Sequence, residues 1–186
     1  MPNGYNHIAL ATRDLAATHR FYTEIMGFSL ATVVAAPTPP APGASESSGW
    51  ARHVFYDCGN GQYMAFWDIH DPAITVPPSD LSASMGLPVW VNHLAWDSPD
   101  EAAFDERLQH WRSNGITVAE IDHGFCRSIY TTDPNGIMVE FCLMTRALDA
   151  NDAAKATVLL EALLPELEAG EPALTIHHAI AEPVPA

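Results

Sequence analysis

Residues Tyr5 to Phe28 read YNHIALATRDLAATHRFYTEIMGF, and this stretch decides the fold because a diverged copy of it follows. The second copy, Val91 to Val118, reads VNHLAWDSPDEAAFDERLQHWRSNGITV. Each copy opens with Asn-His before a short apolar run, continues through an acidic helix start, and has a glycine stop. Farther on, NGQYMAFWDI (Asn60 to Ile69) matches NGIMVEFCLM (Asn135 to Met144). The sequence therefore predicts two copies of one unit, a strand, a helix and then further strands.

Capping, turn and periodicity signals place the elements of each copy. An aspartate is the predicted helix N-cap in both copies, Asp14 and Asp100, and a glycine is the predicted stop, Gly27 and Gly115. Strands are predicted at His7–Ala11, Ser29–Ala35, His53–Cys58, Gln62–Asp68, Val91–Trp96, near Val118, at Ser128–Thr131 and at Ile137–Met144.

The domain organisation follows from these elements. Residues 1–146 are predicted to form a single domain of two modules, about 1–71 and 89–146, joined by a proline- and serine-rich linker at 72–88. Residues 147–186 add a leucine-rich helix at Asp149–Ala169, which Pro165 is expected to kink or break. This helix is expected to cover a sheet or a partner subunit. The tail after Gly170 is expected to be loosely held, with His177 and His178 incidental.

Composition narrows the classes of function. The chain has 186 residues, of which 48% are apolar, enough for a sizeable core. Its 23 acidic and 8 basic residues give a net charge of -15, which argues against nucleic acid and anionic membranes as partners. No apolar run approaches the ~20 residues that span a bilayer, and the N-terminus lacks a signal-peptide pattern. The three cysteines are expected to be reduced thiols, which indicates a cytoplasmic protein.

A carboxylate in an apolar strand marks the candidate site. Glu140 lies in IMVEFCLM, where an unpaired charge is costly, and basic partners are scarce, which favours a bound metal. Superposing the two copies makes His7, His93, Glu140 and Ala65 equivalent, so three positions carry ligand-type side chains and the fourth carries none. Two imidazoles and one carboxylate leave open positions on an octahedral ion. Fe(II) is the usual occupant for oxygen chemistry, while Mn, Ni or Zn accept similar ligands.

Strand alternation predicts what surrounds these ligands. Successive side chains point to opposite faces, so Tyr63, Ala65 and Trp67 share one face, equivalent to the face of Glu140. A cavity floored by the three ligands would therefore have Tyr63 and Trp67 on one wall. Such an aromatic wall suits a flat or apolar ligand.

The repeats NHIAL and NHLAW and the ending YTTDPNGIMVE resemble the vicinal oxygen chelate superfamily. That superfamily includes glyoxalase I, fosfomycin-resistance thiol transferases, bleomycin-binding proteins and type I extradiol dioxygenases. The resemblance covers Tyr5 to Met144. It implies an α+β fold in which two paired βαβββ modules form a cupped mixed sheet around a metal held by His7, His93 and Glu140, with the C-terminal helix as an addition. It also implies a homodimer.

Within the superfamily, the chain is most similar to the type I extradiol dioxygenases. Their pattern is a histidine, an apolar-tyrosine pair, acid-proline-x-glycine and a glutamate. These features fall here on His123, Ile129-Tyr130, Asp133-Pro134-Asn135-Gly136 and Glu140. The resemblance implies opening of a catecholic ring by O2, with His123 and Tyr130 as catalytic residues that hydrogen-bond substrate oxygens. Extradiol enzymes usually carry another acid-base histidine on the first module's last strand, where this chain has Gln62 and Tyr63.

Other functions stay open at this point. The same scaffold supports a glyoxalase-like isomerase or a thiol transferase, in which the metal polarises substrate oxygens. Ala65 supplies no fourth ligand for a glyoxalase site, and a transferase of an anionic antibiotic needs basic residues, for which Arg52 and Arg127 are the candidates. A non-catalytic protein that sequesters an aromatic drug would need no metal triad.

Overall fold

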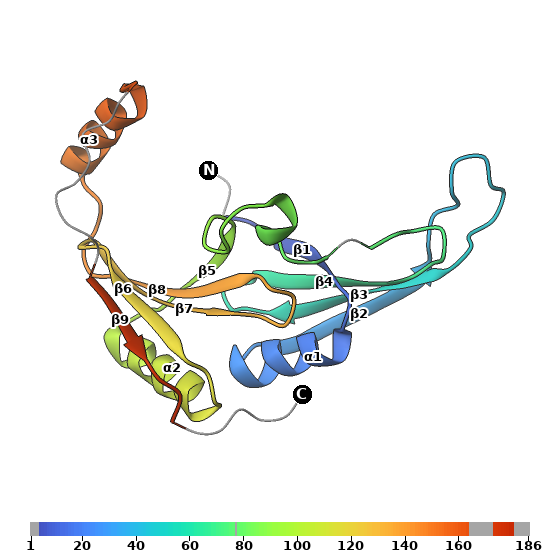
Figure 1. Cartoon of the computed structure of the whole chain (residues 1–186), viewed down its shortest axis with the longest axis horizontal. Coiled ribbons are helices and arrows are strands. Elements are labelled where there is room, and N and C mark those ends of the chain that lie inside the picture. The colour runs from blue at the N-terminus through green and yellow to red at the C-terminus, as the bar shows by residue number, and fades with distance from the viewer. Residues whose placement is uncertain (1–3, 77, 164–172, 181–186) are drawn as a thin grey trace. The chain divides into compact units, whose positions relative to one another are not determined.

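The computed structural model describes residues 4–76, 78–163 and 173–180 of an α+β chain (Figure 1). Its strands form two mixed sheets, one of four strands in the order β1-β4-β3-β2 and one of five in the order β5-β8-β7-β6-β9. The two orders repeat each other apart from β9, which confirms the predicted pair of βαβββ modules. The chain divides into two compact units, residues 1–94 with 132–138, and residues 95–131 with 139–185. Within the described residues, no helix has the length and apolar character needed to cross a bilayer.

The first module has the predicted order of elements. They are β1 (His7–Thr12), α1 (Leu15–Arg20), the π-helical segment η1 (Phe21–Ile25), β2 (Ser29–Pro37), β3 (Trp50–Asp57) and β4 (Tyr63–His70). The Asp14 side chain accepts a hydrogen bond from Ala17 N, as expected of the N-cap. Tyr22 of η1 packs on the sheet, with ring centroids 5.9 Å from Tyr56 and 4.8 Å from Phe66. Tyr56 and Phe66 are fully buried, so the core of this module lies between its helix and one face of its sheet.

The second module repeats this arrangement after the short 3-10 turn η2 (Ala83–Met85). Its elements are β5 (His93–Asp97), α2 (Glu101–Ser113), β6 (Val118–Asp122), β7 (Cys126–Thr132) and β8 (Met138–Met144). The Asp100 side chain caps α2 by accepting from Ala103 N. Trp111 of α2 lies 5.5 Å from Phe141 of β8, ring centroid to centroid, so Phe141 points to the helix-covered face. Glu140, its neighbour, therefore belongs to the opposite face.

The turn between β7 and β8 is built around a buried carboxylate. Asp133 is 4% exposed, and its side chain accepts hydrogen bonds from Tyr22 Oη (3.1 Å), Asn135 N (2.8 Å) and Ile137 N (2.9 Å). Asn135 Nδ2 also donates to Thr18 Oγ1 at 3.1 Å. Burial raises the pKa of Asp133, and these hydrogen bonds act in the opposite direction. The acid-proline-x-glycine motif thus has a structural role in fixing the hairpin.

The C-terminal helix is shorter than predicted. α3 (Ala150–Glu161) begins at the expected cap, Asp149, but Ala162 has extended backbone, so the prediction of helix is wrong at residues 162 and 163, while its remaining part at 164–169 lies outside the described residues. Pro165 lies outside the described residues. The apolar side chains at the end of α3 are exposed, at 69% for Val158 and 87% for Leu160. Because packing of an apolar face supplies most helical stability, these exposed side chains do little to extend α3 past Glu161.

The prediction of a loosely held tail is wrong for residues 173–180. Strand β9 (Ala173–His177) pairs antiparallel with β6, from Asp122 opposite Ala173 to Val118 opposite His177. The edge of β6 offers unpaired backbone groups, which any extended segment within reach can satisfy.

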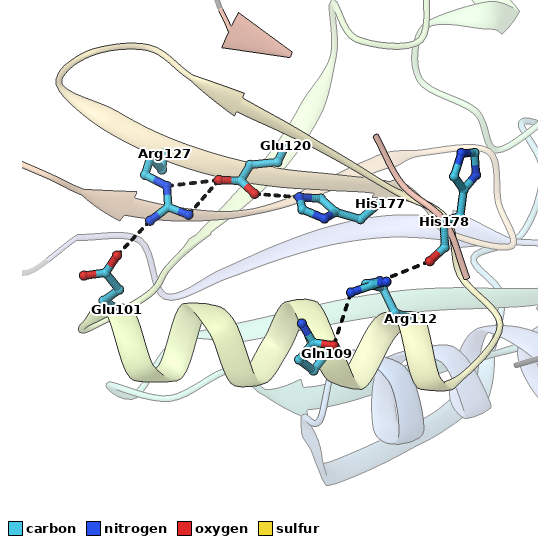
Figure 2. A network of polar contacts seen from close by, with 7 residues as sticks. All are labelled: Glu101, Gln109, Arg112, Glu120, Arg127, His177 and His178. Carbon is cyan, nitrogen blue, oxygen red and sulfur yellow. Dashed lines mark hydrogen bonds and ion pairs between the residues drawn. The ribbon is translucent and has the colours of Figure 1, made fainter. Parts of the chain in front are cut away.

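Ion pairs and hydrogen bonds fix this strand, so His177 and His178 are not incidental (Figure 2). His177 Nε2 lies 2.7 Å from Glu120 Oε2, and Arg127 holds the other carboxylate oxygen at 2.7 Å. Arg112 Nε donates to the His178 carbonyl at 3.0 Å. The sequence gives no local sign of these contacts because the partners are more than 50 residues apart.

Replacing the buried carboxylate should destabilise the protein. Asp133→Ala leaves Tyr22 Oη and two amides unpaired, so we expect the free energy of unfolding to fall by about 3 kcal/mol. Asp57→Ala is the matched control, since exposed Asp57 accepts from Gly59 N in the equivalent turn of the first module. Its loss should be under about 1 kcal/mol. Urea denaturation measures both, and equal losses would contradict the role assigned to Asp133.

The Glu120 network should make β9 sensitive to acid. Burial by itself raises the pKa of Glu120, but hydrogen bonds from Arg127 and His177 outweigh it and leave the pKa below its usual value. The resulting stabilisation is present above about pH 4.3 and is lost as pH falls through the lowered pKa. We expect Glu120→Gln to reduce hydrogen-exchange protection factors in β9 at neutral pH and to remove their acid dependence. Glu106→Gln, on exposed α2 surface, should change neither.

Candidate functional site

The first predicted ligand, His7, opens β1 in an orientation that suits metal binding. Its Nδ1 lies 2.9 Å from Asn6 Oδ1. An amide oxygen only accepts, so Nδ1 carries the proton of the neutral ring and Nε2 keeps its lone pair. Metal-bound histidines are commonly oriented in this way, by a hydrogen bond from the nitrogen that does not touch the metal.

The second predicted ligand, His93, reaches the same tautomer by another route. Its Nδ1 lies 2.9 Å from the Trp90 carbonyl oxygen, which again makes Nδ1 the donor. The preceding Asn92 is used elsewhere, donating from Nδ2 to the Leu81 carbonyl at 3.1 Å. The two Asn-His pairs therefore share a sequence and a histidine orientation but not a hydrogen-bond pattern.

An aromatic cluster shares the sheet face of His7 in the first unit. The parallel register sets His7 opposite Tyr63, Ala9 opposite Ala65 and Ala11 opposite Trp67, which confirms the predicted strand alternation. Two further rings complete the cluster. His53 stacks on Trp67 at a centroid separation of 3.9 Å, and Phe55 lies 5.3 Å from His7.

His53 is the residue that sequence reasoning missed in this unit. Its ring centroid lies 6.0 Å from that of His7. Its Nε2 atom is buried and has no hydrogen-bond partner among the described residues. Burial, and then the proximity of His7, lower the pKa of His53, so the ring is neutral at pH 7. The Gly59-Asn60-Gly61 turn is the sequence feature that could have predicted this position of His53. The turn closes a hairpin in which His53 lies opposite Trp67.

The second unit brings His123, Tyr130 and Glu140 together. Glu140 is 5% exposed on β8, and the neighbouring Tyr130 of β7 is hydrogen-bonded to it. His123 Nε2 lies 3.1 Å from Tyr130 Oη. Burial, then the charge and hydrogen bond of Glu140, raise the pKa of Tyr130 to about 12. Tyr130 is therefore protonated at neutral pH, donating to the Glu140 carboxylate while its oxygen accepts from His123 Nε2.

The chemistry of the donor set fits a divalent metal, but the meeting of the three ligands stays a prediction. His7 and His93 belong to the first compact unit and Glu140 to the second. Across residues 4–76, 78–163 and 173–180, no three histidine, cysteine, aspartate or glutamate side chains form a cluster that would hold a metal. The fit rests on two imidazoles whose Nδ1 atoms are each hydrogen-bonded and on one buried carboxylate that is hydrogen-bonded to Tyr130, since ligating side chains commonly have such supporting bonds.

The two basic residues considered for anion binding are both in ion pairs. Arg52 Nε donates to Asp68 Oδ2 at 2.9 Å, and His70 Nε2 lies 2.9 Å from the same oxygen. Arg127 bonds Glu120 and, at 2.9 Å, Glu101. Neither guanidinium offers an uncompensated charge to a substrate anion.

Comparison with known families places the chain. The family model of the Glyoxalase/Bleomycin resistance protein/Dioxygenase superfamily matches residues 4–141. The chain belongs to this superfamily. The match confirms the resemblance inferred from the two Asn-His repeats, while the closer likeness to extradiol dioxygenases stays a prediction.

Solved structures share the fold. The superfamily member is similar to the fosfomycin resistance protein FosX from Listeria monocytogenes, with 19% identity, 78% of this chain and 96% of that chain covered, and a TM-score of 0.52. A glyoxylase/bleomycin resistance protein/dioxygenase domain from Frankia sp. EAN1pec has 15% identity, 77% and 99% coverage, and a TM-score of 0.53. Comparison with curated proteins finds no match. At these identities the similarity shows the fold alone.

Removing the carboxylate should weaken metal binding. We expect Glu140→Ala to lose at least tenfold in affinity for Fe(II), about 1.4 kcal/mol, because one of three ligands is gone. Anaerobic equilibrium dialysis with metal analysis measures this. Glu106→Ala, a surface glutamate of the same unit, should bind as the wild type does. Unchanged affinity in Glu140→Ala would remove this residue from the site.

Proposed function

We propose that this protein is a metal-dependent oxidoreductase, an extradiol-type dioxygenase that cleaves a catecholic ring with O2. The observation that carries the proposal is the chain from His123 Nε2 through Tyr130 Oη to the buried Glu140 carboxylate. It connects an exposed imidazole to a predicted metal ligand. The proposal includes a small aromatic substrate, O2 and a homodimeric assembly.

The proposed metal is Fe(II), held by His7, His93 and Glu140. When bound, it supplies Lewis acidity toward both diol oxygens and an open position for O2. Members of the superfamily bind divalent metals, and Mn, Ni or Zn suit the same ligand types.

His123 and Tyr130 act on the substrate through hydrogen bonds. With its pKa raised to about 12, Tyr130 remains a hydrogen-bond donor throughout the physiological range and does not serve as a base. The ring of His123 is fixed by the tyrosine hydroxyl, which lies 3.1 Å from its Nε2. We assign to His123 and Tyr130 hydrogen bonds with the substrate oxygens.

His53 supplies an imidazole that the extradiol pattern lacks at Gln62 and Tyr63. It lies on the same sheet face as His7 and Tyr63, with a neutral ring and a buried, unpaired Nε2. A buried nitrogen without a partner is costly unless a ligand satisfies it. We propose that His53 hydrogen-bonds the substrate or O2 from the first module.

The competing functions lack comparable support. A transferase of an anionic antibiotic would require free cations, and Arg52 and Arg127 are already paired. The aromatic face around Trp67 would also suit a protein that only binds an aromatic drug. Such a protein has no need for a buried glutamate hydrogen-bonded to a tyrosine, which costs desolvation free energy.

Anaerobic purification, reconstitution with Fe(II) and addition of a catechol panel under oxygen test the proposal. A yellow ring-cleavage chromophore is the expected result. His123→Ala should retain metal, because Tyr130 still bonds Glu140, and should lower kcat by about 10²- to 10⁴-fold. His110→Ala, on α2, is the control and should match the wild type. Bound metal without turnover would favour the isomerase or transferase, and failure to bind metal would favour the drug-binding protein.

A further inference from the structure

A cavity of about 660 Å³ lies in the second unit beside His123. The turn between β6 and β7 forms one side, and α3 with the segment that precedes it forms the other. Its lining includes His123, Phe125, Leu148, Ala153, Ala156 and Leu159. This volume is within the range of about 300–1,000 Å³ found for small-molecule sites. The C-terminal extension, which the family match to residues 4–141 excludes, thus builds one wall.

The segment before α3 is hydrogen-bonded to the β6–β7 turn. Thr145 N donates to the Phe125 carbonyl at 3.0 Å, which ties the end of β8 to that turn. Arg146 then forms a two-pronged ion pair with Asp152 of α3, at 2.6 and 2.8 Å. A capping box between Asp149 and Asp152 closes the helix start. These bonds connect the start of α3 to the β6–β7 turn.

The charges in the lining compensate one another. The lining contains two cations, Arg146 and Lys155, and two anions, Asp149 and Asp152. Arg146 is engaged by Asp152, and the charge of Lys155 also acts on Asp152. No cation is therefore left over for a carboxylate, and the net charge of -15 repels anions further.

Apart from these charged residues and His123, the lining is apolar and partly exposed. Phe125 is 38% exposed and Leu148 is 59% exposed, and both face the cavity. Each side chain would gain hydrophobic free energy by contact with an apolar ligand. The one imidazole of the lining, His123, is hydrogen-bonded to Tyr130 Oη, so the apolar part of the cavity begins beside a proposed catalytic residue.

We propose that this cavity binds an uncharged, apolar substituent of the substrate ring. The substrate class is then alkyl- or aryl-substituted catechols rather than catechols that carry a carboxylate. This inference rests on the proposed function, since it places the reacting ring at His123. α3 is the element that determines specificity.

Filling the cavity tests the inference. In the Fe(II) protein, Ala156→Phe should raise KM for 4-tert-butylcatechol by tenfold or more and leave KM for catechol within twofold. Ala154→Phe is the matched control, because Ala154 is on the same helix, is exposed and does not line the cavity. It should alter neither KM. The wild type should also prefer 4-tert-butylcatechol to 3,4-dihydroxybenzoate. Equal effects of Ala156→Phe on both catechols, or a wild-type preference for the carboxylate, would overturn the inference.

A binding measurement separates this inference from the proposed function. Calorimetric titration with 4-tert-butylphenol, which lacks the second hydroxyl, needs neither metal nor turnover. Binding to the wild type and to Ala154→Phe, with at least tenfold weaker binding to Ala156→Phe, supports the cavity even when no catechol is cleaved. If catechol is cleaved but 4-tert-butylphenol binds Ala156→Phe as tightly as the wild type, the cavity assignment is overturned and the proposed dioxygenase activity is unaffected.

Discussion

The buried carboxylate of Asp133 is the constraint on which the second module's chemistry depends. It accepts hydrogen bonds from Tyr22 Oη, Asn135 N and Ile137 N, so the turn between β7 and β8 has one conformation. A turn fixes hairpin register, and a slip of one residue would send every side chain to the other face. By fixing this register, Asp133 places Tyr130 and Glu140 on the sheet face opposite α2, where they are hydrogen-bonded to each other. The acid-proline-x-glycine motif, which indicates the family in the sequence, thus acts in the structure through the hydrogen bonds of Asp133.

Glu140 shows how an acid is accommodated in an otherwise apolar strand. Its burial would be costly without a partner, and Tyr130 supplies one. An arginine would neutralise the charge of the carboxylate, whereas a hydroxyl donor stabilises the carboxylate and leaves its charge in place. The charge therefore remains available to a cation. His123 extends the chain of hydrogen bonds to the outside of the unit, next to a cavity that the C-terminal helix completes.

Much of this arrangement was predictable from sequence, and what was missed has a physical reason. Helix caps at Asp14 and Asp100 are local interactions, and the structure confirms them. Strand alternation correctly set Tyr63 and Trp67 on the face of His7, because that period is a property of the backbone. His53 was left out of the predicted site since its face follows from hairpin register, a pairing between two strands. Strand β9 depends on the open edge of β6, about 55 residues earlier in the chain, and no local pattern reports such an edge.

The two modules keep one backbone plan and differ in chemistry. Ala65 and Glu140 occupy equivalent strand positions, both almost fully buried, at 0% and 5% exposure. In the first module Phe55 lies opposite this alanine and its ring contacts that of His53, whereas in the second Tyr130 is hydrogen-bonded to the glutamate. A small residue leaves room for rings to pack, and a carboxylate demands donors, so each position dictates its neighbours. Divergence of a repeated fold has thus given the first module an aromatic face and the second module a polar one.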